Sequence, residues 1–218
     1  KALLLSQWDR AIALVMSAKY VSHPDELAAK KGFSERWMHI VNLPMHQRRE
    51  EIRKLADEAL SRMPDHCFGE IALLRAMTQN KTTRQCLHAM PHRAMYMLAY
   101  WSSLWNKAVS RRIKLYGAHK LVEGDLVSVL PLHHDVYGIA DGIMNVSHVT
   151  KKDIQMKRYN VRDLVLPLPG RAVELAVPKN EVGAYLERLL KKEGVYDLVC
   201  AGSDEKAHKW LRGVRVVA

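Results

Sequence analysis

The sequence predicts an α+β protein, with a helical first half followed by a small, mostly antiparallel β region with a packed helix. Three observations predict this fold class. Apolar residues recur at three- and four-residue steps over much of the first 116 residues, as in amphipathic helices. One helical pattern runs without interruption from 91 to 116. After Gly117, short β-branched runs alternate with glycine and proline, which indicates strands and turns.

Several helices are expected before the long one. Residues 1–20 have one apolar face. A short helix is expected next, ending at Gly32, because glycine often ends helices. Strong helix formers fill the segment between the prolines at 44 and 64. Residues 69–90 predict a helical pair with a break near 79–81.

The pattern at 91–116 separates into two stripes on a helical wheel, and Gly117 is expected to cap its end. The apolar stripe is expected in the core and holds Met95, Leu98, Ser102, Trp105, Val109, Ile113 and Tyr116. The stripe nearly opposite holds Tyr96, Tyr100, Ser103, Lys107, Arg111 and Lys114. Because aromatic rings stack on bases and cations contact phosphates, this second stripe predicts nucleic-acid binding. The alternative is a solvated face whose tyrosines pack on a neighbouring loop.

The second half predicts short strands and one clear helix. Strands are expected in 121–132, at the start of 146–154, in 161–175 and at 210–218. An amphipathic helix is expected over 180–195. The expected N-terminal caps are Thr150, with Asp153 at its third position, and Asn180.

The charge of the chain is concentrated in one segment. The net charge is +11, and residues 71–122 contain nine basic and no acidic residues. The basic residues are Arg75, Lys81, Arg84, Arg93, Lys107, Arg111, Arg112, Lys114 and Lys120. Segregated positive charge of this kind favours a polyanionic partner, above all a nucleic acid.

Composition favours an intracellular protein. Cys67, Cys86 and Cys200 form no CxxC pair, which favours a reducing compartment, and the mitochondrion, nucleus and cytoplasm all fit. No apolar run approaches the roughly 20 residues that span a bilayer, so we expect no membrane partner. The first residues are amphipathic and not signal-like, and we expect the chain to begin within a longer protein.

Motifs for catalysis or metal binding are missing. The sequence contains neither a GxxxxGK[ST] nor a GxGxxG phosphate loop. His133, His134 and Asp135 are adjacent, but no distal Cys/His pair completes a metal site, so we expect no metal. Serine and histidine residues are dispersed without a nucleophile motif. These residues alone therefore support nucleic-acid binding and no particular chemistry.

Motifs along most of the chain resemble the TruD family of RNA pseudouridine synthases, in its eukaryotic-type branch. The long helix carries Arg93-Ala-Met-Tyr-Met-Leu-Ala-Tyr100, Ser102, Leu104-Trp105-Asn106 and Ser110-Arg-Arg-Ile113. Downstream, the matching residues are Gly124-Asp125-Leu126-Val127, Val149-Thr150, Asp153, Tyr159, Asp163 and Leu166-Pro-Leu-Pro-Gly170.

The resemblance implies a TruD-type insertion domain over 1–205, with 206–218 as a strand returning to a catalytic domain. Motif residues with an implied structural role are Trp105, Asn106, Gly124, Asp125, Pro167, Pro169 and Gly170. The implied RNA-binding residues are those of the second stripe together with Arg93.

Two departures from the family pattern bear on activity. Trp101 stands where that pattern has glutamine. The family's catalytic aspartate lies in a Gly-x-Lys-Asp-Arg motif that this chain lacks, and Lys152-Asp153 is followed by isoleucine and aligns elsewhere. We therefore expect no catalytic residue within this chain.

The family's reaction isomerises uridine to pseudouridine without cofactor or metal. An aspartate attacks the nucleoside, the C–N glycosidic bond breaks, and the uracil rejoins through carbon, with the base flipped out of its stack. The resemblance implies RNA as the partner (transfer, ribosomal or messenger), alone or in a ribonucleoprotein particle. Two alternatives stay open: a non-catalytic ribonucleoprotein-assembly factor derived from the family, and a protein-interaction domain that meets an acidic protein.

Overall fold

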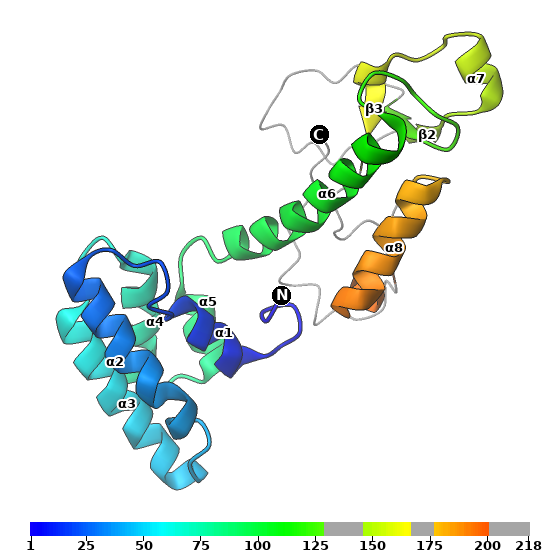
Figure 1. The fold of residues 1–218 in the computed structure, drawn as a ribbon. Helices are drawn as coiled ribbons and strands as arrows, with labels where there is room; N and C mark the ends of the chain where they lie inside the picture. Colours follow the sequence, from blue (N-terminus) through cyan, green and yellow to red (C-terminus); the bar gives the residue numbers. More distant parts are fainter. Residues whose placement is uncertain (129–145, 167–176, 201–218) are drawn as a thin grey trace. The chain divides into compact units, whose positions relative to one another are not determined.

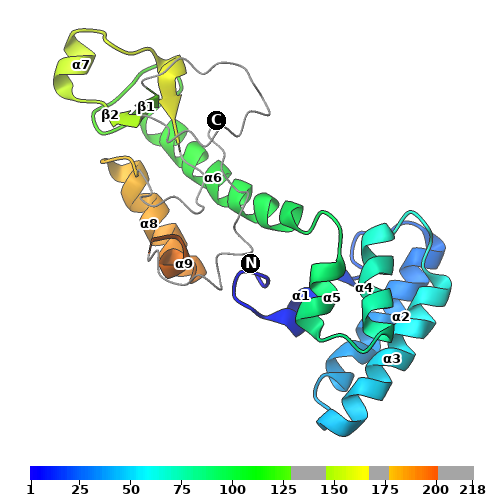
Figure 2. The same cartoon turned by 180° about the vertical axis from the view of Figure 1, so that it is seen from behind.

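The computed structural model describes residues 1–128, 146–166 and 177–200, and the chain divides into two compact units, 1–97 and 98–218. Figures 1 and 2 show the ribbon from opposite sides. In the described residues the first unit is helical, and the second combines helices with three short strands. The predicted α+β class is confirmed. None of the described helices is both long and apolar enough to cross a bilayer.

The first unit is a bundle of helices that pack in sequence order. Helix α2 packs on α3, α3 on α4 and α4 on α5, while α1 contacts α5 and α2 (Figure 1). The helices are α1 (Trp8–Val15), α2 (Pro24–Ile40), α3 (Met45–Arg62), α4 (Phe68–Thr78) and α5 (Thr83–Ala89). Their buried core includes Ile12, Phe33, Trp37, Leu55, Leu73, Leu74, Met77 and Leu87.

Helix α2 does not end at Gly32, so that prediction is wrong. The helix continues to Ile40, because Phe33 and Trp37 lie one turn apart on its buried face and their rings stack at 5.3 Å. Glycine inside a helix is about 1 kcal/mol less favourable than alanine, whereas burying one large apolar side chain contributes about 1.5–3 kcal/mol. Burial therefore outweighs the local preference of glycine.

Two further expectations in this unit had different outcomes. The helix expected over 1–20 is shorter, because Ser6 has a φ of 54° and α1 begins only at Trp8. The break expected near 79–81 is confirmed: α4 ends at Thr78, and Thr82 with Gln85 forms a capping box that starts α5.

Helix α6 (Ala94–Tyr116) is the longest described helix and runs through the boundary between the two units. It ends where predicted. Gly117 has a φ of +77°, the left-handed conformation that glycine adopts without strain, and its N–H donates to the carbonyl of Ile113 at 2.8 Å.

The buried face of α6 differs from the predicted apolar stripe. The buried residues are Met97, Trp101, Leu104, Ala108 and Arg112. No residue of the predicted stripe is buried, and Met95 is 64% exposed. The buried stripe lies one position earlier, which is about 100° around the helix. The predicted apolar and basic stripes therefore flank the buried face on its two sides and remain nearly opposite each other.

The second unit contains a small antiparallel sheet with strand order β2-β1-β3. The strands are β1 (Leu126–Ser128), β2 (Val146–His148) and β3 (Leu164–Val165). Leu126 pairs with His148 on one side and with Val165 on the other. The described helices after the first strand are α7 (Lys151–Gln155), the 3₁₀ turn η1 (Val161–Asp163), α8 (Glu181–Glu193) and α9 (Tyr196–Cys200).

The predicted caps in this unit are confirmed. Thr150 and Asp153 form a capping box at α7, and the side chain of Asn180 accepts from the N–H of Val182 at α8. Gly194 ends α8 in the left-handed conformation. The loop with His133, His134 and Asp135, most of the second predicted strand pair and the predicted strand at 206–218 lie outside the described residues.

Candidate nucleic-acid interface

A buried ion pair joins α6 to the first strand. Arg112 is 5% exposed and Asp125 is 1% exposed, and Arg112 Nη2 lies 2.8 Å from Asp125 Oδ2. The same guanidinium also donates to the carbonyl oxygens of Gly117 and Lys120. Its hydrogen bonds therefore bind the C-terminal turn of α6, the connection that follows and the start of β1.

Gly124 and Asp125 connect this pair to α8. Besides Arg112, Asp125 accepts from the backbone N–H of Val122 at 2.9 Å and from Asn180 Nδ2 at 3.0 Å. Gly124 has a φ of +82°, and a β-carbon there would overlap the carbonyl oxygen of Lys179. The glycine is needed for its conformation and for the close approach of that backbone. The Gly-Asp motif is thus a structural junction between α6, the first strand and α8.

Trp105 anchors a second motif of the chain by a hydrogen bond. Its Nε1 donates to the carbonyl oxygen of Leu166 at 2.7 Å, so α6 holds the first residue of the Leu-Pro-Leu-Pro-Gly segment. Asn106 is exposed, so its amide is open to solvent and needs no buried partner. Pro167, Pro169 and Gly170 lie outside the described residues.

Trp101 is a core residue. It is fully buried, and its Nε1 has no hydrogen-bond partner among the described residues. Its exchange for the family's glutamine therefore changes the packing of the second unit and places no new chemical group on its surface.

Two residues of the predicted basic stripe contact α8. The hydroxyl of Tyr100 donates to Glu193 Oε2 at 3.3 Å, and burial together with the Glu193 carboxylate raises the pKa of Tyr100 to about 12. The guanidinium of Arg111 lies 5.8 Å from the centre of the Tyr185 ring, within cation–π distance. Both side chains are half-buried, so this part of the stripe also holds α6 against α8 (Figure 2).

The remaining members of the stripe in the second unit are exposed. Ser103, Lys107 and Lys114 face solvent, and neither lysine has a carboxylate partner within the described part of the chain. Lys107 and Lys114 are seven positions apart on one face, about 10 Å along the axis. Two such cations can contact separate phosphates of a nucleic-acid backbone.

Arg93 and Tyr96 belong to the first unit. Arg93 Nη1 donates to the carbonyl oxygen of His88 at 3.1 Å, which ties the start of α6 to the end of α5. Tyr96 is 47% exposed, and partial burial together with the nearby Glu70 raises the pKa of its hydroxyl. The proposed RNA-binding role of these two residues stays a prediction.

Comparison with known proteins shows the family to which this chain belongs. The family model described as "tRNA pseudouridine synthase D (TruD)" matches residues 6–198. The chain belongs to the TruD family. Among its relatives, human pseudouridylate synthase PUS7L is 34% identical over 146 residues, which cover 64% of this chain and 20% of that protein.

More distant TruD proteins match longer segments. The mouse pseudouridylate synthase 7 homolog is 28% identical over 196 residues, covering 87% of this chain and 24% of the relative. The probable tRNA pseudouridine synthase D of Archaeoglobus fulgidus is 25% identical over 175 residues, covering 73% and 41%. The chain therefore spans about a fifth to two fifths of the length of these TruD relatives.

Most residues that contact this part of α6 are not predictable from the sequence. Arg112 lies in a family motif but outside the predicted core. The sequence predicts Tyr185 and Glu193 only as parts of an amphipathic helix, and Asn180 only as its cap. Their contacts join residues distant in the chain, such as Tyr100 and Glu193, and helical periodicity carries no information on such pairs. Burying the Arg112 guanidinium without a counter-charge would cost free energy. The Gly124-Asp125 motif that follows α6 contains the carboxylate that could have been predicted as its partner.

Proposed function

We propose that the protein containing this chain is a pseudouridine synthase that isomerises uridine in RNA, and that this chain forms part of its RNA-binding region. The observation that supports the activity is the match of the TruD family model to residues 6–198. The chain lacks the Gly-x-Lys-Asp-Arg motif, so we assign the catalytic aspartate to a part of the protein beyond this segment.

Transfer RNA is the first substrate to test. The family description and the name of the Archaeoglobus fulgidus relative both specify tRNA. Ribosomal and messenger RNA are the other classes that a basic surface of this kind suits, including RNA held in a ribonucleoprotein particle. Pseudouridine maps of RNA from cells with and without the protein identify the class, because a synthase that is lost leaves its own sites as uridine.

The RNA contact is assigned to the exposed lysines of α6. Lys107 and Lys114 carry no neutralising carboxylate among the described residues, so binding to phosphate does not first require an ion pair to be broken. Tyr100 and Arg111 serve the packing of α6 on α8 as well. Their replacement would mix loss of binding with loss of structure, and the two lysines give the cleaner test.

Replacement of Lys107 and Lys114 by alanine should weaken RNA binding without unfolding the chain. If each lysine neutralises one phosphate, the slope of log affinity against log salt should fall by about 1.4–1.8. Titration of a labelled RNA with the 218-residue chain at several salt concentrations measures the affinity and the slope together.

The matched control is Lys31→Ala with Lys152→Ala. These lysines are also exposed on helices and also lack a carboxylate partner among the described residues, so the net charge changes by the same amount. We expect the control to retain the wild-type salt slope. Equal slopes for both double variants would show that only total charge matters and would contradict the assignment to α6.

The non-catalytic alternative gains no support from Trp101. Its side chain is buried in the second unit, so the departure from glutamine reflects packing. Two results together would favour the assembly factor over the synthase. The full-length protein would bind RNA with the predicted salt slope, and its deletion would leave the pseudouridine map unchanged.

A further inference from the structure

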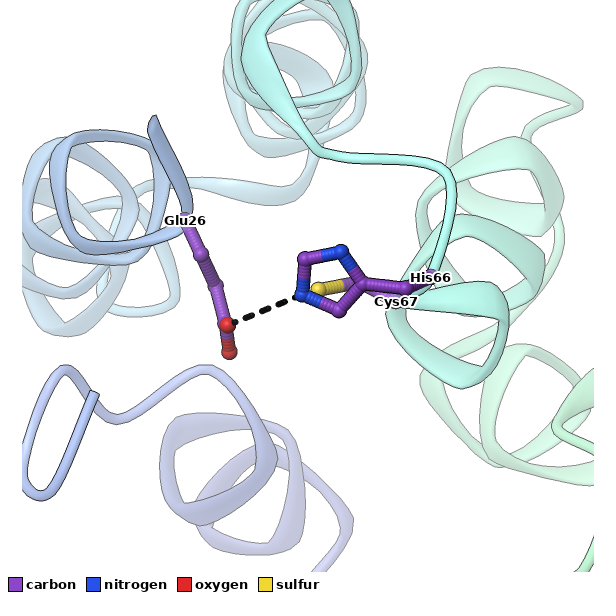
Figure 3. Close-up of side chains that lie close together, drawn as sticks. All are labelled: Glu26, His66 and Cys67. Carbon is purple, nitrogen blue, oxygen red and sulfur yellow. Dashed lines mark ion pairs between the residues drawn. The ribbon is translucent and has the colours of Figure 1, made fainter. Parts of the chain in front are cut away.

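Three metal-ligand side chains meet in the first unit, away from α6. The donor atoms of Glu26, His66 and Cys67 all lie within 4.8 Å of one another, and His66 Nε2 is 3.6 Å from Glu26 Oε2. Figure 3 shows the Glu26 carboxylate and the His66 ring pointing toward each other, with the Cys67 sulfur behind the ring.

The first turn of α2 and the turn between α3 and α4 carry these groups. Glu26 lies in the first turn of α2, whereas His66 and Cys67 lie in the turn between α3 and α4, with Cys67 as the residue that precedes α4. The site thus joins the start of one helix to the connection between two others. Such a link between separate elements is what structural zinc sites provide in small helical units.

The spacing suits a tetrahedral ion. With metal–ligand bonds of about 2.0–2.1 Å, two nitrogen or oxygen ligands of a tetrahedral ion lie about 3.4 Å apart. The measured distance of 3.6 Å between His66 and Glu26 is close to that value. His23, at the start of α2, contacts the His66 ring edge-on with 5.3 Å between ring centres, which places a second imidazole beside the group.

The surroundings resemble the outer shell of a metal site. Lys30 is 6% exposed and contacts the other oxygen of Glu26 at 2.9 Å and Glu70 at 2.7 Å. A ligating carboxylate is commonly held by a hydrogen bond of this kind. Two carboxylates and one ammonium leave one negative charge, and the thiolate form of Cys67 would add another. A divalent cation neutralises both.

We propose that Glu26, His66 and Cys67 bind a divalent transition-metal ion of the zinc type. Thiolate, imidazole and carboxylate together are typical zinc ligands, and the site fills its fourth position with water or His23. The role is structural, because the site fastens α2 to the α3–α4 turn. No spacing motif marks this group in the sequence, because Glu26 is distant in the chain from the adjacent His66 and Cys67.

Binding must release a proton. Burial, together with the nearby Glu26 and Glu70 carboxylates, raises the pKa of the Cys67 thiol to about 11. At neutral pH the thiol is therefore protonated, and a metal ion takes its place on sulfur as the proton leaves to solvent.

Cobalt(II) and zinc(II) titrations of the 218-residue chain, in a reductant that does not bind metals, test the proposal. Cobalt should produce a thiolate-to-metal charge-transfer band at one equivalent, and zinc should displace it. Zinc should also raise the midpoint of thermal unfolding. Cys67→Ala should abolish the band. His66→Ala, which alters an exposed side chain and so should leave the fold intact, should weaken binding by about 100-fold or more.

Cys86→Ala is the matched control. Cys86 is also buried, and its pKa is likewise raised to about 11, chiefly by burial, but it does not belong to the cluster. The control should keep the cobalt band and the zinc-induced stabilisation. A charge-transfer band that survives Cys67→Ala, or no band and no thermal shift in the wild-type chain, would overturn the proposal.

Discussion

Replacement of Asp125 by alanine should lower the free energy of unfolding of the second unit by about 3–5 kcal/mol, since it leaves the buried guanidinium of Arg112 without its counter-charge. The variant also removes the acceptor for Val122 and Asn180. Hydrogen exchange of the β1 and α8 amides measures the loss, because it reports on the second unit separately from the first.

Asp197→Ala provides the control for this prediction. Asp197 is an exposed aspartate of the same unit, in the first turn of α9, and its loss should change stability by less than about 1 kcal/mol. The double variant Arg112→Met with Asp125→Leu should be more stable than Asp125→Ala alone, because no unpaired charge remains buried. A single variant as stable as the control would show that the ion pair does not hold the junction.

Trp101→Ala should destabilise the second unit by about 3–5 kcal/mol, the usual loss when a fully buried tryptophan is truncated. The cavity would open on the buried face of α6, which also carries Leu104 in the second unit. Urea unfolding combined with hydrogen exchange of α6 amides measures the effect.

Trp101→Phe separates packing from hydrogen bonding. The indole N–H has no partner among the described residues, so phenylalanine removes only part of the packing, and the loss should stay below about 2 kcal/mol. Trp105→Phe instead removes a hydrogen bond to Leu166. A loss in the free energy of unfolding below about 1 kcal/mol for Trp101→Ala would contradict the role of Trp101 as a core residue of the second unit.

Local signals predicted much of this structure. The end of α6 at Gly117, the break before α5 and the caps of α7 and α8 are all confirmed, whereas α6 begins at Ala94 and not at residue 91, because His92 has a φ of 53°. Each depends on residues within a few positions of each other, such as Thr150 and Asp153 or Asn180 and Val182. Capping and turn preferences act at that range, so the sequence contains the needed information.

The wrong predictions arose where tertiary packing overrides local preference. Gly32 favours a helix end, but Phe33 and Trp37 extend α2 past it. On α6, the wheel assigned the core to the most apolar stripe, whereas Arg112 is buried because Asp125 neutralises it from another element. The candidate metal ligands were missed for the same reason, since Glu26 and Cys67 meet only after the helices pack.

The most direct test of the central proposal is a transcriptome-wide pseudouridine map from cells that lack the protein, complemented with full-length wild type or with the Lys107→Ala, Lys114→Ala variant. Deletion should convert a defined set of pseudouridines to uridine, with wild type restoring all of them and the variant restoring them poorly at equal protein abundance. An unchanged map after deletion would contradict the assignment as a synthase, and full restoration by the variant would contradict the role of the α6 lysines.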